Sequence, residues 1–391
     1  MNDNNKKLSF AEKLFLLGII AKQFYILPSG LPQVGDILIL SSFLLFWMSG
    51  LQKETYGEES TLRVFVALVV IVNGLHMLLY PSSGFLLPVF YYIFNFCVVL
   101  LTKSLMKVEV FSTKLEWVIK IDLIIQGFIY LSGRGRWYYG IRYMGSFNDP
   151  NQYAFFIFGA MLVLCLLSKI NNKLKENIFW YFFAFYLMLP AASTGMLAGF
   201  LVFFVLFTGL NTISGRGKII GVVIAVMIAT FILSKVADGT IVLPASISES
   251  FIMQRLVNKI NGLSNSSKQL TEDRQWGILL KYPLYIFVGA GEGSFMRFGI
   301  TSEIHSSILA PLWYYGLIPF SVWITWCKRK IQKVDRSVWC VYFALIIESI
   351  TLVNNRQPFF WMIFILADYC LDRRYFVKEK GEKPYENAIH T

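Results

Sequence analysis

The sequence predicts an all-α membrane protein that crosses the bilayer about twelve times and carries one large loop. Three observations predict this. Hydrophobic residues make up 56% of the 391 residues and charged residues only 15%, whereas a soluble domain carries about 25% charged residues. Apolar segments long enough to span a bilayer follow one another along the chain. One long polar stretch, residues 238–304, interrupts them. We therefore interpret residues 1–391 as a single integral membrane domain.

The candidate spans are mostly apolar segments, each near the length of about 20 residues that a transmembrane helix needs. They lie at about residues 10–29, 34–51, 62–80, 84–102, 115–132, 150–168, 177–192, 195–213, 218–237, 305–326, 337–354 and 357–372. The polar N-terminal segment runs into the first span without a small-residue cleavage site, so we expect a retained helix.

Lysine and arginine set the predicted orientation, because they are enriched in cytoplasmic loops. Most of the 36 lysines and arginines share one side if the N-terminus is cytoplasmic. Both termini are therefore expected inside and residues 238–304 outside. The net charge of +12 follows from this topology and does not indicate nucleic acid binding. The five cysteines form no CxxC pair, so no disulfide framework or zinc site is expected.

Arginine predominates over lysine on the predicted outer side, and its planar fork suits phosphate and carboxylate groups. The outer arginines are Arg134, Arg136, Arg142, Arg255, Arg274, Arg297 and Arg356. Two interpretations stay open here: a phosphate-bearing ligand at the outer leaflet, or headgroup contacts and ion pairs between loops.

The segment RYMGSFNDPNQYA, residues 142–154, contains a predicted helix start. Asp149 is typical of an N-cap and Pro150 of the first helical position. Asn151 then lies in the first turn of the sixth span. Because helix N-termini bind anions, Arg142 beside this helix end predicts an anion site.

Two later segments complete the outer candidates. Periodicity around Trp276 predicts an interfacial helix that carries Arg274. The glycines of GAGEGSF, residues 289–295, lack a strand–helix unit and are expected to form a tight turn. His305 opens the span 305–326 from outside, where an imidazole with a pKa near 6.5 is suited to act as a base. Glu303 is a candidate to orient that imidazole.

Ionisable residues inside the predicted spans keep a transporter interpretation open, because such groups are costly in lipid and often functional. Asp122 is a candidate to be offset by Lys120, and Glu348 has no evident partner nearby. His76 is expected to be a core histidine with its hydrogen bonds satisfied. The intramembrane acids are Asp36, Asp122 and Glu348.

The ordered pattern of these segments resembles the O-antigen ligase and polysaccharide polymerase superfamily. The residues that carry the resemblance lie between about 140 and 320: Arg142, Gly145, Phe147, Asp149, Pro150, Asn151, Ala154, Arg274, Trp276, Gly289, Gly291, His305 and Gly316. Two features depart from the family pattern. Ser306 stands where asparagine is common, and the run AASTGML near residue 190 lacks the arginine of a Ser-Arg pair.

The resemblance implies a metal-independent, helical glycosyltransferase fold (GT-C-like) in the bacterial cytoplasmic membrane, with no cofactor. It implies a polyprenyl-diphosphate-linked oligosaccharide as substrate, acted on at the outer face, with flippase and chain-length regulator proteins as candidate partners. Arg142 and Arg274 match arginines that hold the diphosphate, and His305 matches the candidate base. Arg136 or Arg356 is expected to supply a third arginine contact.

We expect a polymerase of capsular, O-antigen or exopolysaccharide repeat units, with His305 and Arg274 catalytic and with Asp149, Asn151 and Glu303 shaping the site. A ligase that transfers finished glycan to another acceptor is the closest alternative. A lipid-linked oligosaccharide flippase is the alternative from a different class.

Overall fold

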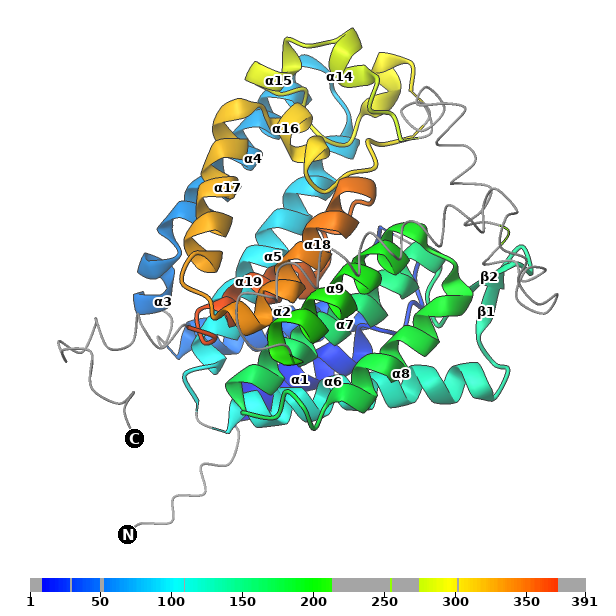
Figure 1. Ribbon diagram of the computed structural model, residues 1–391. Coiled ribbons are helices and arrows are strands. Elements are labelled where there is room, and N and C mark those ends of the chain that lie inside the picture. Colours follow the sequence, from blue (N-terminus) through cyan, green and yellow to red (C-terminus); the bar gives the residue numbers. More distant parts are fainter. Residues whose placement is uncertain are drawn as a thin grey trace, which may run out of the picture.

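The computed structural model is mostly helical and describes residues 9–371 apart from 29, 50–52, 109, 213–253, 255–273 and 301. Its α-helices are α1 (Phe10–Ala21), α2 (Val34–Met48), α3 (Lys53–Glu58), α4 (Ser60–Leu79), α5 (Leu86–Leu105), α6 (Phe111–Leu131), α7 (Pro150–Ile170), α8 (Ile178–Met188), α9 (Thr194–Thr212), α14 (Ile278–Lys281), α15 (Tyr285–Val288), α16 (Leu309–Tyr315), α17 (Leu317–Ile331), α18 (Trp339–Thr351) and α19 (Pro358–Ala367) (Figure 1). The 3-10 turns are η1 (Ser83–Phe85), η2 (Leu189–Ala191), η3 (Phe295–Phe298) and η4 (Arg336–Val338).

One short hairpin departs from the all-α prediction. Strands β1 (Arg136–Tyr138) and β2 (Arg142–Gly145) pair antiparallel between α6 and α7. Gly145 ends β2 with a φ of 56°, and a Cβ there would lie 2.7 Å from the Gln126 side-chain oxygen. The turn that the sequence predicts at Gly145 is therefore confirmed, and both the backbone angle and the space require glycine.

Four helical segments in the described part of the chain are long and apolar enough to cross a membrane. They are Ser60–Leu79, Ser83–Leu105, Pro150–Ile170 and Thr194–Asn211. Other expected spans form shorter helices, such as the 12 residues of α1 and the 10 residues of α19. The span 218–237 and the loop residues 238–273, apart from Gln254, lie outside the described residues. The total of twelve spans stays a prediction.

Helices α7 and α19 form the centre of the bundle. All ten residues of α19 are buried, and α7 buries nearly every side chain after its first turn. Helix α7 packs against α6, α8, α9, α18 and α19. A helix that is apolar on all sides needs neighbours on all sides, so these two helices hold the surrounding ones in place.

Large apolar side chains are exposed on the outward faces of the peripheral helices. Examples are Trp47 and Met48 on α2, Ile71 and Leu78 on α4, and Phe128 on α6. Contiguous apolar surface is rare on soluble monomers and marks contact with other molecules or membranes. The apolar helices are therefore compatible with association with a lipid bilayer.

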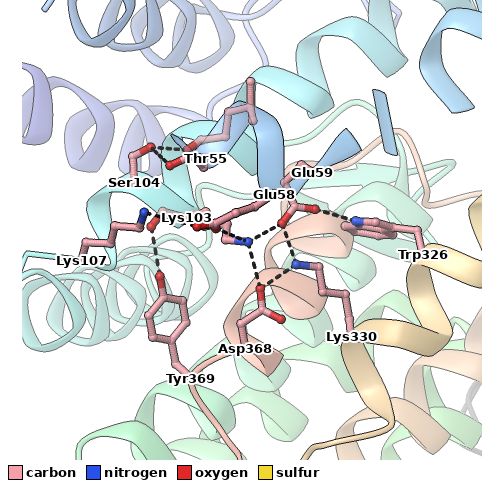
Figure 2. Close-up of polar contacts among 11 residues, drawn as sticks. Thr55, Glu58, Glu59, Lys103, Ser104, Lys107, Trp326, Lys330, Asp368 and Tyr369 are labelled. Atoms are coloured by element: carbon pink, nitrogen blue, oxygen red, sulfur yellow. Dashed lines mark hydrogen bonds and ion pairs between the residues drawn. The ribbon is translucent and has the colours of Figure 1, made fainter. Parts of the chain in front are cut away.

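A buried ion cluster ties four helices together at the end of the bundle that the sequence places in the cytoplasm (Figure 2). Lys103 of α5 and Lys330 of α17 each lie 2.6 Å from Oε1 of Glu59, which immediately precedes α4. Lys330 also pairs with Asp368 after α19 at 2.6 Å, and the Trp326 indole donates to Glu59. The cluster thus joins the ends of α4, α5, α17 and α19.

Replacing Glu59 with alanine is expected to lower the free energy of unfolding by about 3–5 kcal/mol, because two buried lysines lose their shared carboxylate. The matched control is Glu58→Ala. The Glu58 side chain is 46% exposed, so its ion pair is worth about 0–1 kcal/mol. Thermal unfolding of both purified variants in the same detergent measures the difference, and equal midpoints would contradict a stabilising role for the cluster.

Candidate functional site

The start of α7 supplies the first part of the candidate site. The Asp149 carboxylate accepts hydrogen bonds from the backbone N–H of Asn151 at 2.7 Å and of Gln152 at 3.1 Å, and Pro150 is the first helical residue. The predicted N-cap and first helical proline are confirmed. This cap leaves the Asn151 side chain in the first turn of α7.

Arg142 lies beside that helix start, as the sequence predicts. From β2 its Nη2 donates to Oδ1 of Asn151 at 2.8 Å, and its Nε donates to the Ala191 carbonyl at 2.9 Å. The Ser193 hydroxyl donates to the same Asn151 oxygen at 3.2 Å. The AASTGML segment therefore reaches this site through Ser193 and a backbone carbonyl, although it contains no arginine.

Arg136 belongs to a different group of contacts. It lies on β1, where Nη1 donates to Oδ1 of Asn148 at 2.6 Å and Nη2 donates to the Tyr25 carbonyl at 3.2 Å. These bonds fasten the hairpin to the segment after α1. The structure thus gives Arg136 a contact set that does not include Asn151 or His305.

Arg274 and His305 lie side by side, although 31 positions separate them in the sequence. The backbone N–H of His305 donates to the Arg274 carbonyl at 3.1 Å, and the Trp276 indole donates to the His305 carbonyl at 3.3 Å. The Arg274 guanidinium donates to the carbonyl of Thr351, the last residue of α18. A cation at this position also interacts favourably with the helix dipole.

The predicted interfacial helix around Arg274 is wrong within the described residues. Arg274 lies in a turn, and the following helix α14 has only four residues. Gln275 has a φ of 58°, which is outside the helical region, and Pro283 follows the end of α14. Left-handed backbone at one end and proline at the other keep the helix short.

The predicted span 305–326 is also corrected. The Ser306 hydroxyl accepts from the backbone N–H of Ile308 at 3.2 Å and of Leu309 at 3.0 Å, so α16 begins after His305 rather than at it. Gly316, with a φ of 86°, then separates α16 from α17. His305 therefore lies in a non-helical segment, where the backbone aims the imidazole independently of a helix.

Charges from four separate segments act on the His305 imidazole. Burial lowers its pKa from the usual 6.5; Glu303 and Asp149 act to raise the pKa, and Arg274 and Arg356 act to lower it. The structure therefore brings together the start of α7, the Arg274 turn, the His305 segment and the turn before α19. These are the segments that the sequence selects, apart from that of Arg136.

Arg356 is clamped by two carboxylates. It makes two bonds to Glu303, at 3.2 and 2.6 Å, and a third to Glu292. Burial alone would raise the pKa of Glu303, but the Arg356 guanidinium holds that pKa below its usual 4.5. These ion pairs favour a positioning role for Arg356 over the expected diphosphate contact, and they turn Glu303 toward Arg356.

Glu292 is the residue of this group that the sequence analysis missed. It is only 4% exposed, its carboxylate accepts from the Tyr315 hydroxyl at 2.5 Å, and its backbone N–H donates to Asn73 of α4 at 2.9 Å. The available signal was an acid in the GAGEGSF run, where glycines allow close backbone approach. Glu292 thereby links the GAGEGSF segment to α4, α16 and the Arg356 turn.

The acids of the predicted spans have polar partners. Asp122 accepts from the Gln23 amide at 2.9 Å, while Lys120 pairs with Glu116 at 2.7 Å, so the expected offset of Asp122 by Lys120 is wrong. The physical reason is that residues four apart share a helix face and residues two apart do not. Asp36 pairs with Lys22 at 2.5 Å, and Glu348 accepts from Asn354 and Ser349.

Comparisons with known proteins add no family assignment. No protein-family model matches the chain, and no curated protein matches it. Within the described residues, no three histidine, cysteine or carboxylate side chains gather as candidate metal ligands. The chemistry of the site must therefore be argued from its own side chains.

Glu292→Ala is expected to destabilise the fold by about 3 kcal/mol, because it removes the buried Glu292 carboxylate from the half-buried Arg356 and from the Tyr315 hydroxyl. Tyr315→Phe is the matched control, since it removes only one hydrogen bond to the same carboxylate, worth about 1.5–3 kcal/mol. Thermal unfolding in detergent compares the two. A larger loss from Tyr315→Phe would contradict the central position of Glu292.

Proposed function

We propose that this chain is a membrane glycosyltransferase that joins polyprenyl-diphosphate-linked oligosaccharides into a polysaccharide on the outer face of the bacterial cytoplasmic membrane. The observation that carries the proposal is the convergence around His305. Asp149, Arg274 and Glu303 come from three distant parts of the sequence and act on the His305 imidazole. Arg142 bonds to Asn151, close to Asp149 at the start of α7. Arg142, Asp149, Arg274 and His305 belong to the motif pattern that resembles this class of enzyme.

The side chains of this site suit transfer from a diphosphate leaving group. The acceptor hydroxyl attacks the anomeric carbon of the donor sugar, the bond to the diphosphate breaks, and the His305 imidazole accepts the hydroxyl proton. Arg142 and Arg274 are the cations proposed to stabilise the negative charge that develops on the leaving diphosphate. The carbonyl bonds that hold both guanidinium groups keep them oriented before the substrate arrives.

The loop contacts agree with the proposed topology. Glu292, Arg136 and Arg142 belong to segments that the sequence places outside, and they bond to Asn73, Tyr25 and Ala191, which lie in the outward halves of predicted spans. Lys103 and Glu59, and Lys169 and Asp335, are ion pairs from segments placed inside. The contacts thus fall into two groups at opposite sides of the predicted spans, and we propose that the site lies at the outer side.

Purified protein with lipid-linked repeat units tests the activity. A polymerase is expected to produce a ladder of longer glycans and to release polyprenyl diphosphate. Transfer of finished glycan to a different acceptor without a ladder would indicate a ligase. Translocation of unmodified lipid across vesicles, with neither product, would indicate a flippase and contradict the enzyme proposal.

Two variants are expected to impair polymer formation for different reasons. His305→Ala removes the proposed base and should lower the rate at least about 100-fold. Arg142→Lys keeps the charge but loses the planar fork that holds a diphosphate, so the rate should fall while the fold is retained. Ser302→Ala in the same outer segment is the control, measured by the same glycan ladder. Wild-type polymer from His305→Ala would disprove the assignment of the base.

The pH dependence of the rate should follow the His305 pKa, which burial places below 6.5. The neutral imidazole is the active form, so the rate should be level at neutral pH and fall by about tenfold per pH unit below that pKa. The pKa of Glu303 is also lowered, so its ion pair with Arg356 persists above the usual carboxyl pKa of 4.5. The thermal unfolding midpoint should therefore change little across the pH range in which the rate falls. If the midpoint and the rate fell together, unfolding would explain the pH dependence of the rate.

A further inference from the structure

Arg297 differs from the other described arginines of the candidate site in its hydrogen bonding. It lies on η3, and its Nη2 donates to the Gly291 carbonyl at 3.3 Å. Its Nε and Nη1 are buried and have no hydrogen-bond partner among the described residues. Arg356 also has a buried Nε without a partner among the described residues, but its Nη atoms donate to the carboxylates of Glu303 and Glu292, whereas Arg297 has no carboxylate partner there.

Aromatic rings surround the Arg297 guanidinium. Its central carbon lies 5.1 Å from the ring centre of Tyr80, 4.9 Å from that of Phe85 and 4.6 Å from that of Phe298. Such contacts attract a cation, by about 0.5–2 kcal/mol each. However, an aromatic ring is only a weak acceptor for an N–H group, and each unpaired buried donor costs about 1–3 kcal/mol. The rings hold the cation in place without satisfying its donors.

The positive charge of Arg297 has no carboxylate near it among the groups that affect its pKa. Burial lowers the pKa of its guanidinium, and the groups that act to raise it are the hydroxyls of Tyr285, Tyr80 and Tyr314, none of which is a carboxylate. His76 lies against the same turn, 3.1 Å from the Gly289 carbonyl through Nε2, and its buried Nδ1 also lacks a partner. An anionic oxygen is the chemical group that this environment lacks.

The position of Arg297 indicates where that anion comes from. Tyr80 caps the C-terminal end of α4, one of the four helices able to span a membrane. Next to it, Leu78 is 80% exposed, and Met296, beside Arg297, is 76% exposed. Apolar side chains exposed at the end of a span face lipid. Tyrosine side chains at the ends of spans commonly lie at the level of the lipid headgroups, so a membrane-spanning α4 would bring the Arg297 guanidinium to the lipid phosphate groups.

We propose that Arg297, held between Tyr80, Phe85 and Phe298, is a binding site for the phosphate group of a membrane lipid at the outer leaflet. The phosphate oxygens accept the hydrogen bonds of Nε and Nη1, and the acyl chains lie along the exposed face of α4. This site is separate from the group around His305, and it does not depend on the glycosyltransferase proposal.

Lipid binding to the full-length protein in a neutral detergent tests the site. The probes are dioctanoyl phosphatidylglycerol, dioctanoylglycerol, which has the same chains and no phosphate, and inorganic phosphate. Thermophoresis gives the dissociation constant for each. Arg297→Gln is expected to weaken phosphatidylglycerol binding by at least about tenfold, equivalent to losing one charge-assisted hydrogen bond. Arg134→Gln, with the same charge change on an exposed outer turn, is expected to bind as the wild type.

Three results would overturn the assignment. Equal affinity of wild type and Arg297→Gln for phosphatidylglycerol would remove Arg297 from the site. If the wild type bound dioctanoylglycerol as tightly as phosphatidylglycerol, the phosphate group would not be recognised. If the wild type bound inorganic phosphate as tightly as phosphatidylglycerol, the site would be one for a free anion and not for a lipid. If Arg297→Gln fails to give a monodisperse folded protein, Arg297→Lys is the substitute. It is expected to bind several-fold more weakly than the wild type, and unchanged binding would contradict recognition by the guanidinium.

Discussion

A backbone N–H group that is buried away from water needs a hydrogen-bond partner, and the non-helical segments of the structure depend on this constraint. The segment around His305 shows how it is met. The backbone N–H of Ile304 donates to the Tyr314 hydroxyl, that of His305 to the Arg274 carbonyl, and that of Ser307 to the Ser349 and Leu352 carbonyls. An irregular backbone persists here because neighbouring protein groups satisfy it. The same bonds keep the imidazole in one place.

Buried charged side chains are paired with opposite charges at both ends of the bundle. At one end two lysines share Glu59 and Asp368, and at the other Arg356 is held between Glu292 and Glu303. A buried ion is tolerated only with close partners of opposite charge. Each cluster joins segments distant in sequence, so the charges that are most costly to bury also define how the helices are arranged.

Local signals in the sequence were enough to predict several features. Asp149 and Pro150 specify a helix start through their own chemistry, and Gly145 specifies a turn, so both predictions are confirmed. The start of α16 depends on the Ser306 hydroxyl, which accepts from the backbone N–H groups of Ile308 and Leu309, and an apolar pattern that continues to His305 does not reveal it. Periodicity also overestimated the helix around Arg274, where the positive φ of Gln275 leaves no trace in composition.

The long-range ion pairs were beyond the reach of such signals. Glu292 and Arg356 lie 64 positions apart, and no spacing rule relates them. Which carboxylate an arginine selects depends on how the helices pack, and hence on the whole bundle. For this reason Arg356 was expected to contact a substrate, whereas its neighbours in the fold are two acids. The order of the motifs predicts that their residues share one site with His305. The hydrogen bonds that hold each residue there depend on the packing of the helices and are not predicted by that order.

The last turn of α18 has a mechanical consequence. Arg274 bonds to Thr351, and the His305 segment bonds to Ser349 and Leu352, so both side chains are fastened to the same helix end. Arg142 is fastened instead to Asn151 of α7 and to Ala191. The gap between these two groups is therefore set by how α18 sits against α7. A small tilt between the two helices would change the distance between the two groups, while the hydrogen bonds within each group stay the same.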